Sequence, residues 1–153
     1  MEKDCLFCKI IRGEIPSWNV FESENYLAFL TPFPNTPGFT VVIPKEHLTS
    51  AIFSLMEGDY LALLSAARDV AHRLEQGLSC MRVAMIAEGM AIDHAHIKLI
   101  PLHGIPDGPW QPVLSNAPYF SEKYEGYLTT HDGPRMSDEE LSKIQGAILS
   151  AGK

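Results

Sequence analysis

Residues 81–102 read MRVAMIAEGMAIDHAHIKLIPL, and this stretch decides the fold. Two segments rich in apolar and β-branched residues, Met81–Ala87 and His94–Leu102, lie on either side of Glu88-Gly89. This pattern predicts two strands joined by a turn. The stretch follows a long helix predicted over Leu55–Gln76, where apolar side chains recur at helical spacing and form one stripe.

Further strands are predicted on the N-terminal side of that helix. Trp18–Glu22 and Tyr26–Leu30 flank a short polar segment and indicate a hairpin, and Phe39–Ile43 is a third strand that ends at a proline. A C-terminal helix is expected over Asp138–Leu149. Because strands outnumber helices and do not alternate with them, we expect an α+β fold with an antiparallel sheet of about five strands.

Several boundaries follow from local signals. Phe7–Arg12 is predicted to form a short first helix, and Tyr124–Thr130 a late strand. Ser54 and Glu57 have the spacing of a capping box at the start of the long helix, and Gly77 is expected to end it.

The length of 153 residues predicts one domain over 1–153, with a core over 5–102 and a C-terminal extension over 103–153. Twelve Lys and Arg against 19 Asp and Glu give a net charge of −7. This balance argues against a nucleic-acid polymer or an anionic membrane as partner, although a local site can still hold one small phosphate compound.

Location is inferred from signals that the chain lacks. We expect a cytoplasmic protein, since the N-terminal residues do not resemble a signal peptide and no stretch approaches the ~20 apolar residues of a membrane span. Three cysteines, two of them in a Cys-x-x-Cys pair, favour thiols or metal ligands over disulfides.

The pattern His94-Ala-His96-Ile-Lys98 places polar side chains at every second position of a predicted strand. Alternate side chains of a strand share a face, so all three would project to the same side. A neutral imidazole is a nucleophile, and a lysine attracts phosphate, so the trio is suited to phosphoryl transfer. The alternative is a solvated strand face without a function.

Separate segments of the chain, in order, resemble one family. They are CLFCKIIRGEIP at 5–16, AFL at 28–30, PGFTVVIPKEH at 37–47 and the His-x-His strand. The chain resembles the histidine triad (HIT) superfamily, in the branch of nucleoside phosphoramidases and dinucleoside polyphosphate hydrolases. The resemblance implies a HIT-like fold with one long central helix and a C-terminal helix.

The resemblance also implies catalytic roles. His96 falls on the nucleophile, which attacks the α-phosphorus of a nucleotide and becomes a nucleotidyl-histidine. His94 falls on the first histidine of the triad, which supports the site. Lys98 stands where the third histidine is usual, and one branch of transferases has glutamine there. The change puts simple hydrolysis in doubt, because lysine donates its proton poorly near pH 7.

A nucleoside pocket is implied by the same resemblance. Thr31 stands where relatives usually have a ribose-binding aspartate, and Ala91 replaces a phosphate-binding Ser or Thr. The implied nucleotide-binding residues are Leu6, Phe7, Ile10, Phe29, Leu30, Thr31, Gly89 and Ala91. The alternative for the apolar members is an ordinary place in the core.

Cys5, Cys8, His47 and His94 form a candidate zinc site. Two cysteines and two histidines complete a closed, structural tetrahedral shell. The resemblance supports this, because zinc-binding HIT proteins place ligands at these positions. Free thiols and histidines without a metal are the alternative. No organic cofactor is expected.

These observations together predict an enzyme, a nucleotide hydrolase or nucleotidyl transferase that works through a covalent nucleotidyl-His96 intermediate. Its expected partner is a small nucleoside phosphate. The resemblance further implies a homodimer. Two alternatives remain: a non-catalytic nucleotide- or phosphate-binding adaptor on a HIT scaffold, and a zinc-stabilised interaction module without a ligand.

Overall fold

The computed structural model describes residues 4–105, 108–112 and 134–150. None of the helices in these ranges combines the length and the apolar composition that crossing a membrane requires. The elements in chain order are α1 (Leu6–Ile11), β1 (Trp18–Glu22), β2 (Tyr26–Leu30), β3 (Thr40–Pro44), the 3-10 turn η1 (Ile52–Ser54), α2 (Glu57–Leu78), β4 (Val83–Ile86), β5 (Ile97–Pro101) and α3 (Asp138–Ser150).

The strands form one five-stranded sheet in the order β1-β2-β3-β5-β4, and each neighbouring pair is antiparallel. The α+β prediction is confirmed, together with the long central helix and the C-terminal helix. The late strand predicted over Tyr124–Thr130 lies outside the described residues.

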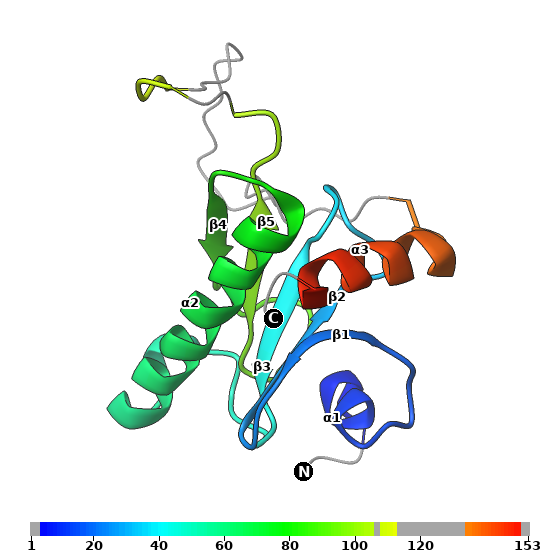
Figure 1. Cartoon of the computed structure of the whole chain (residues 1–153). Helices are drawn as coiled ribbons and strands as arrows, with labels where there is room; N and C mark the ends of the chain where they lie inside the picture. The colour runs from blue at the N-terminus through cyan, green and yellow to red at the C-terminus, as the bar shows by residue number, and fades with distance from the viewer. Residues whose placement is uncertain (1–3, 106–107, 113–133, 151–153) are drawn as a thin grey trace, which may run out of the picture.

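Helices cover both faces of the sheet (Figure 1). On one face, α2 and α3 pack over a core to which every second residue of the inner strands contributes, such as Ala28, Val42 and Ile97. On the other face, α1 packs through Phe7 onto the alternate residues of β2 and β3. The alternation of side chains in buried strands therefore builds two cores from one sheet.

A row of paired residues crosses the second face of the sheet. Phe29 pairs with Val41, Val41 with Lys98, and Lys98 with Ile86. Directly opposed residues of antiparallel strands point to the same side. The register therefore places Lys98 on the face that α1 covers, in line with apolar side chains.

Both ends of α2 differ from the sequence prediction. Met56 precedes the helix and caps it without a side-chain hydrogen bond, so the predicted Ser54–Glu57 capping box is wrong. Gly77 lies inside the last turn, and Ser79, with φ of 50°, takes the left-handed position after the helix. Gly77 is required for packing, because an added Cβ would lie 2.5 Å from Cα of Ile148 in α3.

The strand β5 begins at Ile97, three residues later than predicted. The backbone before it bonds elsewhere: His94 N–H donates to the carbonyl of Ile92 at 2.9 Å, and Ala95 N–H donates to that of Leu48 at 2.8 Å. His94 and His96 therefore precede the strand, and the expectation that one extended strand holds both histidines and Lys98 is wrong.

Candidate active site and metal centre

His96 is a buried histidine, 3% exposed, immediately before β5. Its Nδ1 lies 2.7 Å from the backbone carbonyl oxygen of His94. Since a carbonyl can only accept, Nδ1 carries the proton and Nε2 keeps its lone pair. Burial, with a further contribution from the Lys98 charge, lowers the pKa of His96 and favours this neutral form.

A cavity of about 440 Å³ opens beside His96 and Lys98. Its wall consists mainly of apolar side chains from α1, β2 and the loop before β5, and Lys98 is the only lysine or arginine among its described lining residues. Most of the predicted nucleotide-binding residues line it: Leu6, Phe7, Ile10, Phe29, Leu30, Thr31 and Ala91. An apolar pocket with a few polar groups is typical of a small-molecule site.

Sequence reasoning missed further lining residues, among them Ile15, Val41, Met90 and Ile92. Val41 could have been found from the alternation of its strand, since it shares a face with Ile43 and not with Val42, which packs on the opposite face of the sheet. The others lie in turns, where no periodic signal marks the direction of a side chain.

Glu88 is a further residue that sequence reasoning missed: it contacts Lys98, although it is not among the described residues that line the cavity. Its Oε1 accepts a hydrogen bond from Nζ of Lys98 at 2.5 Å, and the two side chains are 9% and 15% exposed. Lys98 is thus neutralised by a partly buried partner. The sequence contains a partial signal for this ion pair, because Glu88 just after β4 and Lys98 near the start of β5 carry opposite charges.

The loop before β5 holds two residues in the left-handed region. Gly89 has φ of +69°, and an added Cβ would lie 2.5 Å from the carbonyl oxygen of Ser50. Ala91 has φ of 73°, which is costly for a residue with a side chain. Ala91 lines the cavity, whereas Gly89 is not among its described lining residues and packs against Ser50.

Thr31 follows β2 and lines the same cavity. Its Oγ1 accepts a hydrogen bond from the N–H of Phe33 at 3.3 Å. The hydroxyl can still donate, so it offers one uncharged hydrogen bond to a ligand.

Cys5, Cys8, His47 and His94 meet at one point, although they come from three distant parts of the chain. Their candidate ligand atoms all lie within 4.8 Å of one another. Cys8 Sγ lies 3.4 Å from Nδ1 of His47 and 3.7 Å from Nδ1 of His94. Zinc bonds of about 2.0–2.3 Å at tetrahedral angles imply ligand separations of roughly 3.3–3.8 Å. The cluster could therefore bind a metal ion.

The side chain of His94 belongs to this cluster and not to the cavity. It is fully buried, and its Nε2 donates to the carbonyl oxygen of Pro44 at 2.9 Å. Nδ1 is left to accept beside the two thiols, as metal ligation requires. Burial lowers the pKa of His94. The expectation that His94 faces the same cleft as His96 and Lys98 is corrected.

Comparison with known proteins places these features in a family. The family model described as "HIT domain" matches residues 12–105. The chain is similar to "Protein hit" of Bacillus subtilis, at 36% identity over 69% of this chain and 76% of that protein. It is also similar to the adenosine 5′-monophosphoramidase of Saccharomyces cerevisiae, at 30% identity over 66% of this chain and 64% of that protein.

Solved structures agree with the fold. A HIT family hydrolase from Legionella pneumophila matches with a TM-score of 0.55 and 32% identity, over 71% of this chain and 95% of that one. A zinc-bound histidine triad family protein from Mycobacterium smegmatis shares the fold, with a TM-score of 0.65 and 20% identity over 98% of both chains. Homologues thus include a monophosphoramidase and a hydrolase, and the chain belongs to the HIT domain family.

Proposed function

We propose that the protein is a nucleotide hydrolase or nucleotidyl transferase in which Nε2 of His96 attacks the α-phosphorus of a nucleoside phosphate. The observation that carries this proposal is the hydrogen bond from Nδ1 of His96 to the carbonyl of His94, on a ring that lines the cavity. It fixes the tautomer, so the other ring nitrogen has the lone pair that a nucleophile needs.

The reaction has two steps. In the first, Nε2 forms a bond to phosphorus, and the bond to the leaving group breaks with its electron pair on the leaving atom, which then takes a proton. Lys98 is placed to stabilise charge on the phosphoryl oxygens. In the second step, water or another phosphate attacks phosphorus and releases Nε2. Water gives hydrolysis and a phosphate gives transfer.

The lining of the cavity supports a nucleoside as the bound group. Apolar residues such as Phe7, Ile10 and Phe29 suit a base, while Thr31 can donate to a ribose hydroxyl. The name of the yeast relative makes adenosine phosphoramidate the first substrate to test.

Zinc is proposed as a structural component. Cys5, Cys8, His47 and His94 supply four ligand atoms, and a four-ligand protein shell leaves no open position for substrate. When bound, the metal would link α1 to the segment before α2 through His47 and to the loop before β5 through His94. Both α1 and that loop line the cavity, so the metal would fix their relative position.

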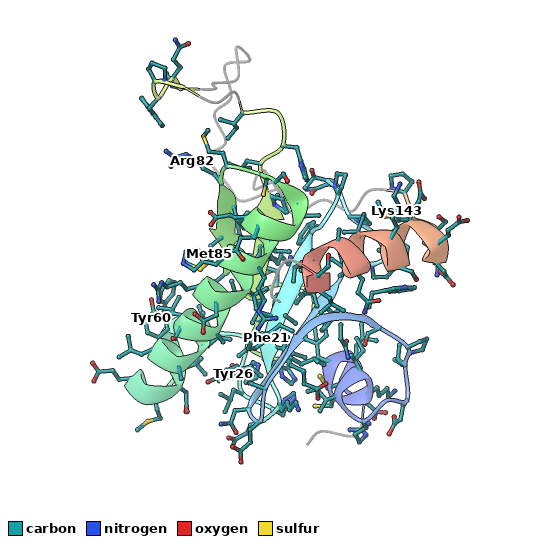
Figure 2. All side chains as sticks on the ribbon, in the orientation of Figure 1. Phe21, Tyr26, Tyr60, Arg82, Met85 and Lys143 are labelled. Atoms are coloured by element: carbon teal, nitrogen blue, oxygen red, sulfur yellow. The ribbon has the colours of Figure 1, made fainter. Side chains whose placement is uncertain are left out.

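A homodimer is proposed through an exposed apolar patch at one edge of the sheet. β4 is an edge strand, and Met85 on it is 54% exposed. Phe53, 86% exposed, and Tyr60 of α2 lie beside Met85 around a shared hollow. Figure 2 shows Tyr60 and Met85 on the same side of the molecule. An unpaired strand edge flanked by apolar side chains is suited to pairing with a second copy.

A second candidate function is a nucleotide- or phosphate-binding adaptor. The observation that favours it is the ion pair of Lys98 with Glu88, which engages the one cation among the described cavity-lining residues. Such a protein would bind the nucleotide without forming a bond to it.

One experiment separates the two functions. Wild type incubated with adenosine phosphoramidate and quenched in acid-free denaturant should carry a nucleotidyl adduct on His96, detected by mass spectrometry. His96→Ala should lose the adduct and turnover by several orders of magnitude. His72→Ala, which removes an exposed imidazole from α2, is the matched control and should keep both. Specific binding without adduct or turnover in the wild type would select the adaptor.

A further inference from the structure

The partly buried Lys98–Glu88 pair is a feature that attack by His96 does not require. Oε1 of Glu88 takes the hydrogen bond from Lys98, whereas Oε2 is shielded from solvent and has no hydrogen-bond partner among the described residues. Glu88 lies two residues after β4, and His96 lies just before β5, so both occupy the same end of the paired strands. A fixed negative charge thus stands next to the cation of the cavity.

We propose that Glu88 makes the site selective for the charge of the phosphate, so that a monoanionic phosphoryl group is accepted and a dianionic one is disfavoured. This inference rests on the proposed function, since it concerns the phosphate that His96 would attack. Glu88 is a specificity-determining residue that acts through its negative charge beside Lys98.

The physical reason is the sum of charges around Lys98, which lines the cavity. Lys98 and Glu88 together carry no net charge, and their low exposure limits screening by salt. A phosphoramidate or phosphodiester has a single negative charge, which the nearer Lys98 can hold. A phosphate monoester has a second pKa of about 6, so at neutral pH most of it carries a second charge. Glu88 repels that additional charge.

The expected consequence concerns turnover. The phosphoramidate substrate is a monoanion, whereas the nucleoside monophosphate that hydrolysis leaves behind is a dianion. A site with an unpaired Lys98 would hold the product at least as well as the substrate. With Glu88 in place, the product is bound less well and leaves, so the site is cleared for the next substrate.

The test compares two ligands that differ in one phosphate charge. Adenosine monophosphate and its methyl ester are titrated into the protein by calorimetry at about pH 8, where only the former is a dianion. The wild type should bind the dianion no more tightly than the ester. Glu88→Gln, which keeps the size of the side chain, should tighten binding of the monophosphate relative to the ester by about tenfold.

Two further variants make the result specific. Glu22→Gln breaks the exposed ion pair with Lys45 and is the matched control, which should leave the ratio of the two dissociation constants unchanged. Glu88→Gln combined with Lys98→Gln removes both charges, so it should restore the wild-type ratio while weakening both ligands. In steady-state assays, Glu88→Gln should lower the inhibition constant of the monophosphate more than KM for the phosphoramidate.

Each outcome has a definite meaning. An equal shift of both ligands in Glu88→Gln would overturn the inference and leave the proposed function intact. A wild type that binds the dianion tenfold more tightly than the ester would also overturn it, and this measurement needs no variant to fold. A wild type that binds neither ligand and forms no adduct would overturn the proposed function and the inference with it.

Discussion

At the scale of single residues, two glycines with nearly the same backbone angle experience different surroundings. Gly13 has φ of +74° with nothing near the position of a Cβ, whereas Gly89, at +69°, has the Ser50 carbonyl oxygen 2.5 Å from that position. A left-handed conformation is strained for any residue with a side chain, but only Gly89 adds a steric conflict with backbone. Its role in the loop beside the cavity is therefore one of close approach.

Replacing these two glycines by alanine separates the two costs. We expect Gly13→Ala to lower the free energy of unfolding by about 1 kcal/mol, from the left-handed angle alone. Gly89→Ala should cost roughly 3 kcal/mol, since overpacking against backbone adds to the same strain. Urea denaturation measures both values. Equal losses in the two variants would show that the loop around Gly89 moves away from Ser50 freely.

The thiols of Cys5 and Cys8 are the residues on which the proposed zinc site depends. Elemental analysis should find about one zinc per chain, and Cys5→Ser with Cys8→Ser should abolish binding and lower the melting temperature, because a ligand that binds only the folded state stabilises it. Cys80→Ala is the control: this buried thiol is not part of the cluster, so zinc should remain. Metal-free wild type that melts at the same temperature as the zinc form would remove the structural role.

At the scale of elements, the contact between α2 and α3 depends on the absence of a side chain. Gly77 allows the last turn of α2 to approach the backbone of Ile148, and the same two helices cover one face of the sheet. The cost that glycine imposes on a helix is offset here by close packing. The C-terminal helix is therefore joined to the central one at a defined position.

Alanine substitutions in these helices should have effects of opposite sign. Gly77→Ala places a Cβ 2.5 Å from Cα of Ile148, so we expect a loss of about 1–3 kcal/mol as α3 is displaced. Gly146→Ala, at an exposed position of α3 with open space around it, should gain about 0.5–1 kcal/mol from helix propensity. Both are read from thermal and urea unfolding. A stabilised Gly77→Ala would mean that the two helices are not held together there.

At the scale of the whole molecule, the exposed apolar patch of Phe53, Tyr60 and Met85 lies beside the free edge of β4. The site residues lie one strand further in: His96 stands just before β5, and Lys98 is part of it. A second copy paired at this edge would thus lie close to the site without covering the strands that build it.

The assembly is tested by placing charge on the patch. Sedimentation velocity should give twice the mass of one chain for the wild type and a single-chain mass for Phe53→Asp with Met85→Asp, because paired carboxylates at an apolar contact are costly to desolvate. Leu149→Asp, a similarly apolar and partly exposed position on α3, should remain dimeric. Cooperative melting of all three proteins shows that the substitutions leave the fold intact. A monomeric wild type at micromolar concentration would refute the assembly.

The sequence by itself determined the elements and the candidate ligands of this protein. Segments rich in aromatic and β-branched residues, bounded by turn residues and prolines, indicated strands near β1, β2 and β3, and helical spacing indicated α2. These signals depend only on neighbours along the chain. The Cys5-x-x-Cys8 pair and the His94-x-His96 pair could likewise be recognised without coordinates. The division of 1–153 into a single domain with a core and an extension stays a prediction.

Only the tertiary structure decided how these residues divide their roles. His94 turns its side chain to the thiols and His96 lies at the cavity, because the backbone between them bonds to Leu48 instead of continuing the strand. The pairing of Lys98 with Glu88 depends on the register of β4 against β5, and the packing of Gly77 depends on a helix about 70 residues later in the chain. Such contacts are set by the packing of distant segments, and no local period in the sequence encodes them.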